Sequence, residues 1–135
     1  MAVLMAGNNQ DMRVMPGNVV LLVDDDPAIR NSLKFALELE GFDVRTFAAP
    51  GEILAADLPE RGCIVVDYYL PGQDGLELLG QLKARDVALP AILITTNPAD
   101  NVRRRASSAG VAIIEKPLLS NALSDAVRDS LARSS

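Results

Sequence analysis

The sequence predicts an α/β protein: a doubly wound, five-stranded parallel sheet with helices on both faces. Two observations support this fold class. Five short runs rich in Val, Ile and Leu are continuous rather than alternating, which is typical of strands buried on both faces. Segments with helical spacing lie between them, and this alternation favours parallel strands joined by right-handed crossovers. The predicted strands are residues 19–23, 44–47, 63–66, 91–95 and 111–114.

The first predicted helix has clear signals at both ends. Asp26 followed by Pro27 fits an N-cap and a first-turn proline, and Gly41 fits the stop. Its inward face is expected to hold Ile29, Leu33, Ala36 and Leu37. A short second helix is expected over residues 51–58, with Ile53, Leu54 and Leu58 facing inward.

Three further helices follow the third, fourth and fifth strands. After a turn at Pro71-Gly72, a helix over residues 75–85 should bury Leu76, Leu78, Leu79 and Leu82. The helix over residues 99–109 is thin in apolar anchors, and we expect it to be mobile. Those anchors are Val102, Ala106 and Ala109. Ser120 is expected to cap the last helix, whose inward residues are Leu123, Ala126, Val127 and Leu131.

The composition of the 135-residue chain limits its function. With one cysteine, Cys63, and no histidine, a structural zinc site, an internal disulfide and a Cys–His nucleophile are excluded. The net charge of −5 argues against general nucleic-acid binding, and no apolar run is long enough to span a membrane. We expect a soluble, cytoplasmic protein with a loose tail over residues 1–17 and one domain over residues 18–132.

Polar side chains stand where four of the predicted strands end. Asp24 and Asp25 follow the first strand, Asp67 the third and Lys116 the fifth, while Thr95 closes the fourth. In a doubly wound sheet the carboxyl ends of the strands form the ligand site, so these side chains should converge.

Three neighbouring carboxylates repel one another, and Mg²⁺ is the natural compensation because it prefers oxygen ligands. The two charges of the cation and the one of Lys116 would balance the three carboxylates. A carboxylate beside Mg²⁺ and an ammonium group is equipped to attack phosphorus.

These motifs, in this order, resemble the receiver domain of two-component response regulators. They are Leu22-Val23-Asp24-Asp25-Asp26, Val66-Asp67 with Pro71 and Asp74-Gly75, Ile94-Thr95, and Lys116-Pro117. The resemblance covers residues 18–132 and implies the flavodoxin-like strand order 2-1-3-4-5.

The resemblance also implies a role for each matching residue. Asp67 corresponds to the phosphoacceptor, and Asp24, Asp25, Asp67 and the carbonyl of Tyr69 to the Mg²⁺ ligands. Thr95 corresponds to the hydroxyl that turns toward the phosphoryl group and Lys116 to the ammonium that pairs with it. The implied partners are a sensor histidine kinase or phosphotransfer protein and a downstream effector or output domain.

Other motif residues have simpler explanations. Asp26 and Asp74 are better explained as helix N-caps than as chemical groups. The basic run Arg103–Arg105 is by default a solvated helix face, with a partner-docking surface as the alternative hypothesis.

The sequence departs from the family at two positions. Ile113 stands where receivers usually carry Tyr or Phe, which puts the usual Thr–aromatic coupling in doubt. Thr96 replaces a smaller residue and would narrow access to Asp67. Tyr69 and Asn97 match the variable positions that tune loss of the acyl phosphate.

Three functions are compatible with these sequence features. The first is a phosphorylation switch rather than a turnover enzyme, and the second is a non-phosphorylated interaction module that keeps the receiver fold. The third is a phosphatase of the haloacid-dehalogenase type, suggested by Asp24-x-Asp26, although Ala28 does not fit that motif.

Overall fold

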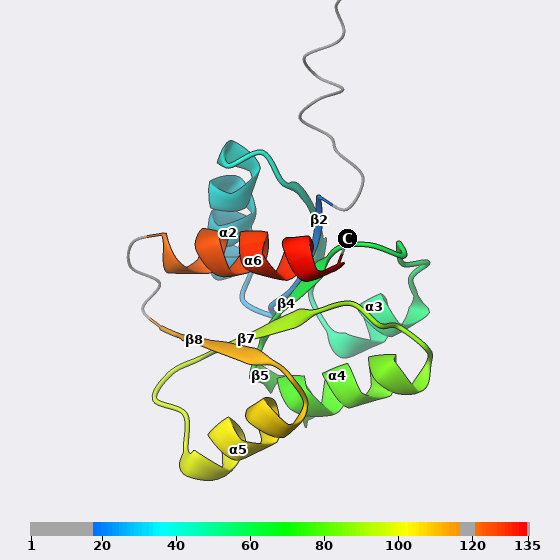
Figure 1. Ribbon diagram of the computed structural model, residues 1–135, viewed down its shortest axis with the longest axis vertical. Helices are drawn as coiled ribbons and strands as arrows, with labels where there is room; N and C mark the ends of the chain where they lie inside the picture. Colours follow the sequence, from blue (N-terminus) through cyan, green and yellow to red (C-terminus); the bar gives the residue numbers. More distant parts are fainter. Residues whose placement is uncertain (1–17, 117–120, 135) are drawn as a thin grey trace, which may run out of the picture.

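The computed structural model describes residues 18–116 and 121–134, and it has the predicted architecture (Figure 1). Five parallel strands form one sheet in the order β3-β2-β4-β7-β8, which is the order 2-1-3-4-5 when the five are counted along the chain. The strands are β2 (Val19–Val23), β3 (Asp43–Phe47), β4 (Cys63–Asp67), β7 (Ala91–Thr95) and β8 (Ala112–Glu115). The helices are α2 (Pro27–Leu39), α3 (Pro50–Ala55), α4 (Gly75–Ala84), α5 (Asp100–Ser108) and α6 (Ala122–Ser134).

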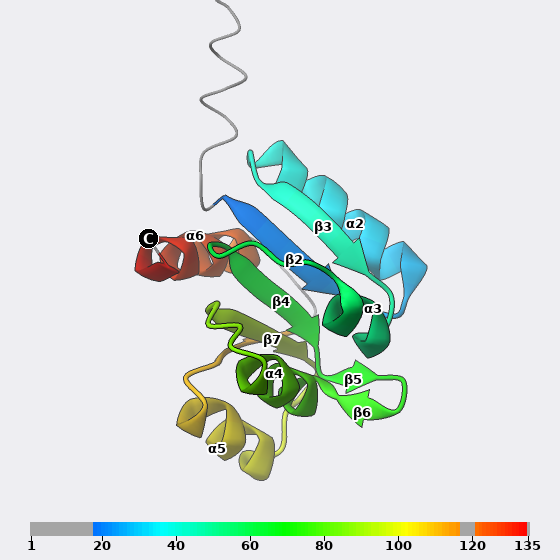
Figure 2. The same ribbon diagram turned by 90° about the vertical axis from the view of Figure 1, so that its right-hand side faces the viewer.

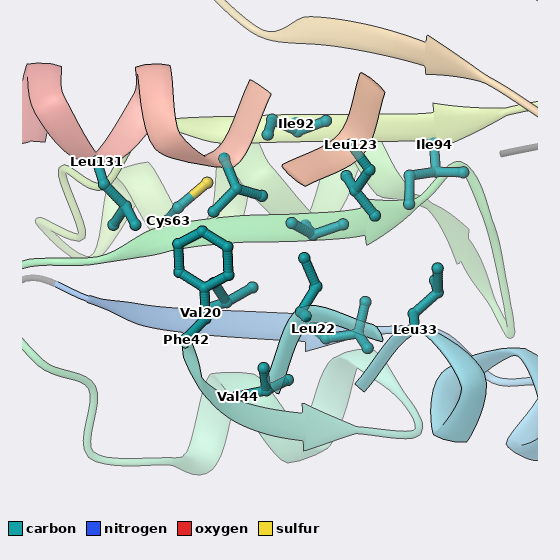
Figure 3. Packing of buried hydrophobic residues seen from close by; sticks show 13 residues of the cluster. Val20, Leu22, Leu33, Phe42, Val44, Cys63, Ile92, Ile94, Leu123 and Leu131 are labelled. Carbon is teal, nitrogen blue, oxygen red and sulfur yellow. The ribbon is translucent and has the colours of Figure 1, made fainter. Parts of the chain in front are cut away.

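Helices cover both faces of this sheet and enclose two apolar clusters. Side chains of α2 and α6 pack on one face, where Leu22 of β2 and Ile92 of β7 lie among them (Figure 3). Side chains of α3, α4 and α5 pack on the other face. Every residue of β4 and β7 is buried, as expected for the centre of a parallel sheet. Cys63 lies in the first cluster, and burial raises the pKa of its thiol to about 11.

Two helix starts follow the predicted capping chemistry. The Asp26 carboxylate accepts hydrogen bonds from the backbone N–H groups of Ala28 and Ile29, so Asp26 is the N-cap of α2. Asp74 caps α4 in a reciprocal capping box with Glu77. Both acids therefore have the structural role that the sequence favoured.

The structure adds one element to the prediction. Residues on either side of the Pro71-Gly72 turn pair as a two-stranded hairpin, β5 (Tyr69–Leu70) and β6 (Gln73–Asp74). Figure 2 shows this hairpin beyond the carboxyl end of β4, next to the start of α4.

Three details of the helix predictions were wrong. Ala36 is exposed because α2 buries the narrower stripe of Leu33 and Leu37. Ala109 is also exposed, since α5 ends before it and buries only Val102 and Ala106. The second helix is α3, which starts on Pro50 and ends at Ala55, so the expected span 51–58 was too long at its C-terminal end.

Some expectations fall outside the described residues. These are the tail over residues 1–17 and the Ser120 cap. In the part of the chain that the structure covers, no helix has the length and apolar character needed to cross a membrane.

Candidate functional site

The sheet brings the five predicted polar residues to one edge. Asp24 and Asp25 follow β2, and Asp67 is the last residue of β4, the strand beside β2. Thr95 ends β7 on the other side of β4, and Lys116 follows β8. The expectation that the strand ends would converge is therefore met by the topology.

Three carboxylates form the centre of this edge. Carboxylate oxygens of Asp24, Asp25 and Asp67 all lie within 4.8 Å of one another. Asp24 is 1 % exposed and Asp67 7 % exposed, whereas Asp25 faces solvent. We call this cluster of Asp24, Asp25 and Asp67 the acidic pocket; two of its acids are buried and one is exposed.

The buried Asp24 carboxylate is only half satisfied. Its Oδ1 accepts a hydrogen bond from the backbone N–H of Asp26 at 2.9 Å. Its Oδ2 is the one buried side-chain oxygen or nitrogen without a hydrogen-bond partner among the residues described. An unpartnered buried oxygen, on a carboxylate that clusters with two others, is a suitable ligand for a hard divalent cation, so the residues present fit Mg²⁺.

Burial also changes the acidity of the pocket. Loss of solvent is the main cause that raises the pKa of Asp24, and the neighbouring charge of Asp67 raises it further. The pKa of Asp67 is raised for the same main reason, although the Lys116 ammonium opposes the shift. Without a cation, the pocket therefore holds its negative charge at a cost in free energy.

Lys116 and Thr95 border Asp67 from the β7–β8 side. The Nζ of Lys116 lies 3.5 Å from Oδ2 of Asp67. The backbone N–H of Lys116 donates to the carbonyl of Thr95 at 2.8 Å, which ties the two residues together. Thr95 is 1 % exposed, so its hydroxyl lies in the protein interior near the strand ends.

The chain after Asp67 is held close to the sheet. The N–H of Tyr68 donates to the carbonyl of Ile94, and the N–H of Gly75 donates to the carbonyl of Tyr68 at 2.7 Å. A Cβ atom at position 75 would lie 2.5 Å from the carbonyl oxygen of Asp67 and 2.9 Å from Cδ1 of Leu93. The close approach of α4 to the backbone of Asp67 therefore requires glycine at position 75. The sequence pattern, which indicates only an N-cap at Asp74, does not reveal this requirement.

Tyr69 lies at the rim of the pocket. Its N–H donates to Oδ1 of Asp67 at 3.4 Å, and its side chain is 65 % exposed. Its ring meets that of Tyr68 edge to face, with the centroids 4.9 Å apart. The predicted use of the Tyr69 carbonyl as a metal ligand stays a prediction.

Arg30 also contacts the site, although the sequence did not predict it. Its guanidinium donates to the backbone carbonyl of Asp24 at 2.8 Å and so connects α2 to the acidic segment. An arginine one turn after an N-cap gives no specific signal in the sequence alone.

The fold and the site together define a class of protein: a doubly wound α/β domain whose acidic pocket suits phosphoryl acceptance. Comparison with known families identifies it further. Residues 20–128 match the family described as the response regulator receiver domain, and the chain belongs to this family. It is therefore a receiver domain of the two-component type.

Individual relatives agree with this assignment. The transcriptional regulatory protein FixJ of Azorhizobium caulinodans is 41 % identical over 117 residues, which cover 85 % of this chain and 56 % of FixJ. The C4-dicarboxylate transport transcriptional regulatory protein DctD of Pseudomonas aeruginosa is 40 % identical over 114 residues, covering 83 % of this chain and 25 % of DctD. The chain thus spans about half the length, or less, of these curated relatives.

Solved structures show the same fold. The response regulator StyR superposes with a TM-score of 0.79 at 36 % identity, covering 86 % of this chain and 60 % of StyR. A CheY-like receiver domain from Methanospirillum hungatei gives a TM-score of 0.77 at 30 % identity, covering 86 % of this chain and 94 % of that one.

Proposed function

We propose that Asp67 is the phosphoacceptor and that it takes its phosphoryl group from a phosphohistidine. In this step an oxygen of Asp67 forms a bond to phosphorus while the phosphorus–nitrogen bond breaks and its electrons return to the imidazole. The observation that carries the proposal is the position of the Asp67 carboxylate, 3.5 Å from the Lys116 ammonium and inside the three-carboxylate cluster.

Magnesium is the proposed cofactor. Asp24, Asp25, Asp67 and the carbonyl of Tyr69 would hold it, and the unpartnered Oδ2 of Asp24 supports this set. When bound, Mg²⁺ neutralises the carboxylates and the charge on the transferring oxygens. The buried Asp24 fixes one side of the pocket because its Oδ1 is held by the Asp26 N–H.

Lys116 and Thr95 would respond to the phosphoryl group. Phosphorylation adds about −1.5 to −2 charges and three acceptor oxygens beside Lys116. The ammonium can pair with those oxygens without leaving Asp67, since it already lies 3.5 Å away. The Thr95 hydroxyl is the second proposed donor, and its motion would shift the segment that leads into α5.

The partners and setting are also proposals. Family membership supports a sensor histidine kinase or a phosphotransfer protein as donor, and a downstream effector or output domain as recipient of the signal. We place this switch in the cytoplasm and assign it no turnover reaction beyond its own phosphorylation and dephosphorylation.

Labelling with acetyl phosphate and Mg²⁺ tests the proposal. Wild type is expected to take up the phosphoryl group, and Asp67→Asn is expected to take up none. Asp26→Asn is the matched control, because it makes the same charge change nearby and Asn is an equally good N-cap. Equal labelling of Asp67→Asn, or none of wild type, would contradict the assignment.

The alternative is an interaction module that keeps the fold without being phosphorylated. Ile113 and Thr96, the two departures from the family pattern, are the observations in its favour. Family membership favours the switch instead. An unlabelled wild type that still binds a partner in the absence of Mg²⁺ would support the module.

A further inference from the structure

Helix α5 contacts the rest of the domain through two buried side chains and two ion pairs. Among its described residues only Val102 and Ala106 are buried. Arg103 pairs with Glu115 of β8 at 2.8 Å, and Arg105 reaches Asp74 with its Nη2 3.3 Å from Oδ2. Two arginines of the basic run therefore form contacts within the molecule.

Asp74, the partner of Arg105, belongs to two elements next to the acidic pocket. Asp74 is the N-cap of α4 and the last residue of the β5–β6 hairpin, where it pairs with Tyr69. Tyr69 is two residues beyond Asp67, and its N–H contacts the Asp67 carboxylate. The hairpin thus connects the Arg105 contact directly to the acidic pocket.

Tyr68, at the start of the same segment, also lies near Arg105. Tyr68 follows Asp67, and backbone hydrogen bonds to Ile94 and from Gly75 hold it in place. The Arg105 guanidinium on α5 therefore pairs with the last residue of the segment 68–74, which carries Tyr69, and lies near the first.

We propose that Arg105 is a positioning residue that couples α5 to the acidic pocket through the hairpin 69–74. This inference rests on the proposed function, because it links α5 to Mg²⁺ binding and phosphorylation. The ion pair between Arg105 and Asp74 holds the hairpin in register, so that Tyr69, whose N–H contacts the Asp67 carboxylate, keeps its place beside the acidic pocket.

Thermodynamic linkage makes this coupling reciprocal. If attachment of α5 through Arg105 favours Mg²⁺ binding, then bound Mg²⁺ must favour attachment of α5 by the same factor. Such a route does not use residue 113, where Ile113 has no aromatic ring to rotate. The route through Arg105 and Asp74 would therefore connect the acidic pocket to α5 without an aromatic residue at position 113.

The test compares three arginine variants in the full chain. Arg105→Gln breaks the proposed coupling, and Arg103→Gln breaks the other ion pair of α5. Arg104→Gln makes the same charge change on the same helix at an exposed side chain. Arg105→Gln combined with Asp74→Asn completes a double-mutant cycle, since Asn keeps the N-cap.

Two measurements follow the coupling. Tyrosine fluorescence reports Mg²⁺ binding, because the chain has no Trp and its two tyrosines, Tyr68 and Tyr69, both lie beside Asp67. Hydrogen exchange of α5 and hairpin amides, with and without Mg²⁺ and beryllofluoride, reports the attachment of α5. Urea unfolding checks that each variant folds.

We expect Arg105→Gln to weaken Mg²⁺ binding by about two- to five-fold, the scale of a partly exposed ion pair. It should also remove the Mg²⁺-dependent slowing of exchange in α5. Arg104→Gln should keep both properties. Arg103→Gln should speed exchange in α5 but keep its Mg²⁺ dependence, and Asp74→Asn should add nothing to Arg105→Gln.

Equal behaviour of Arg105→Gln and Arg104→Gln would overturn the coupling alone, provided that wild type responds to Mg²⁺ and beryllofluoride. Equal loss in Arg103→Gln and Arg105→Gln would also overturn it, because either arginine would then be a simple tether. A wild type that responds to neither ligand would overturn the proposed function, and the coupling with it.

Discussion

The centre of the sheet and its β8 edge are built differently. All residues of β4 and β7 are buried, whereas β8 begins and ends on the exposed residues Ala112 and Glu115. The central strands are covered by helices on both faces, while α5 beside β8 buries only Val102 and Ala106.

This difference suits two separate tasks: the centre of the sheet would hold the cation and the phosphoryl group, and the β8 edge would respond to them. Asp24 and Asp67, the acids that would hold the cation and the phosphoryl group, are both buried. Asp67 ends the fully buried strand β4, and Asp24 directly follows β2, in which only Val19 is partly exposed. Lys116 follows the partly exposed strand β8, beside α5, which buries only Val102 and Ala106. Elements that move are drawn from the regions of low local stability, so the β8 edge suits the responding part of a switch.

A pair of valine truncations should give the largest contrast. Val65→Ala in β4 removes two methyl groups at a site with 0 % exposure and is expected to lower the free energy of unfolding by about 2–3 kcal/mol. Val102→Ala in α5 should lower it by about 1 kcal/mol, because α5 can shift to fill the space. Urea unfolding measures both values, and equal losses would break the comparison.

A pair of glycine substitutions tests the approach of α4 to Asp67. Gly75→Ala places a Cβ atom 2.5 Å from the Asp67 carbonyl, so we expect a loss of about 1–3 kcal/mol and impaired phosphoryl uptake. Gly80→Ala, in the same helix with open space around its Cβ, should instead stabilise by up to about 1 kcal/mol. Thermal unfolding measures the stability of both variants, and phosphoryl labelling measures their uptake. Equal effects of the two substitutions would mean that helix propensity, and not the contact with Asp67, determines the result.

The central region could be predicted well from the sequence because its signals are local. Buried apolar runs, the Asp26-Pro27 start and the polar residues at the strand ends each depend on a few neighbouring positions. This is why the five strands and the convergence of Asp24, Asp67 and Thr95 could be predicted from these residues, whereas the strand order was implied by the resemblance to receiver domains.

The β8 edge and the hairpin could not be predicted in the same way. Pairing of Arg105 with Asp74 joins residues 31 positions apart, and no periodicity encodes it. The requirement for Gly75 depends on the distance between α4 and the Asp67 backbone, which only the packed structure sets. Ala36 and Ala109 were misplaced because a small apolar residue fits either face of a helix.

The charge of the buried pocket gives a smaller effect with a definite sign. Without Mg²⁺ at neutral pH, Asp24→Asn should raise the free energy of unfolding by on the order of 1 kcal/mol, because it removes a partly unpaired buried carboxylate. Added Mg²⁺ should stabilise wild type, by about 2.7 kcal/mol at a hundred times its dissociation constant, but have little effect on the variant. Asp26→Asn is the control and should respond to Mg²⁺ as wild type does.

The same variant has an expected pH dependence. Burial raises the pKa of Asp24 in the folded state above its ordinary value of 3.8, so the folded protein binds this proton more tightly than the unfolded chain. The stability gap between wild type and Asp24→Asn should therefore close as the pH falls from neutral towards 4. A gap that widens on acidification would contradict the raised pKa.

Salt should produce the smallest effect and the one most specific to the β8 edge. Arg103–Glu115 and Arg105–Asp74 join partly exposed side chains, so each pair contributes only about 0.2–1 kcal/mol, and 1 M NaCl screens charges beyond about 3 Å. Amide exchange in α5 should therefore speed up by a few-fold in NaCl, while exchange in β4 and β7 should change little. If NaCl changed amide exchange in α5 no more than in the central strands, the packing of Val102 and Ala106 would be sufficient to hold α5. The two regions would then differ in burial alone.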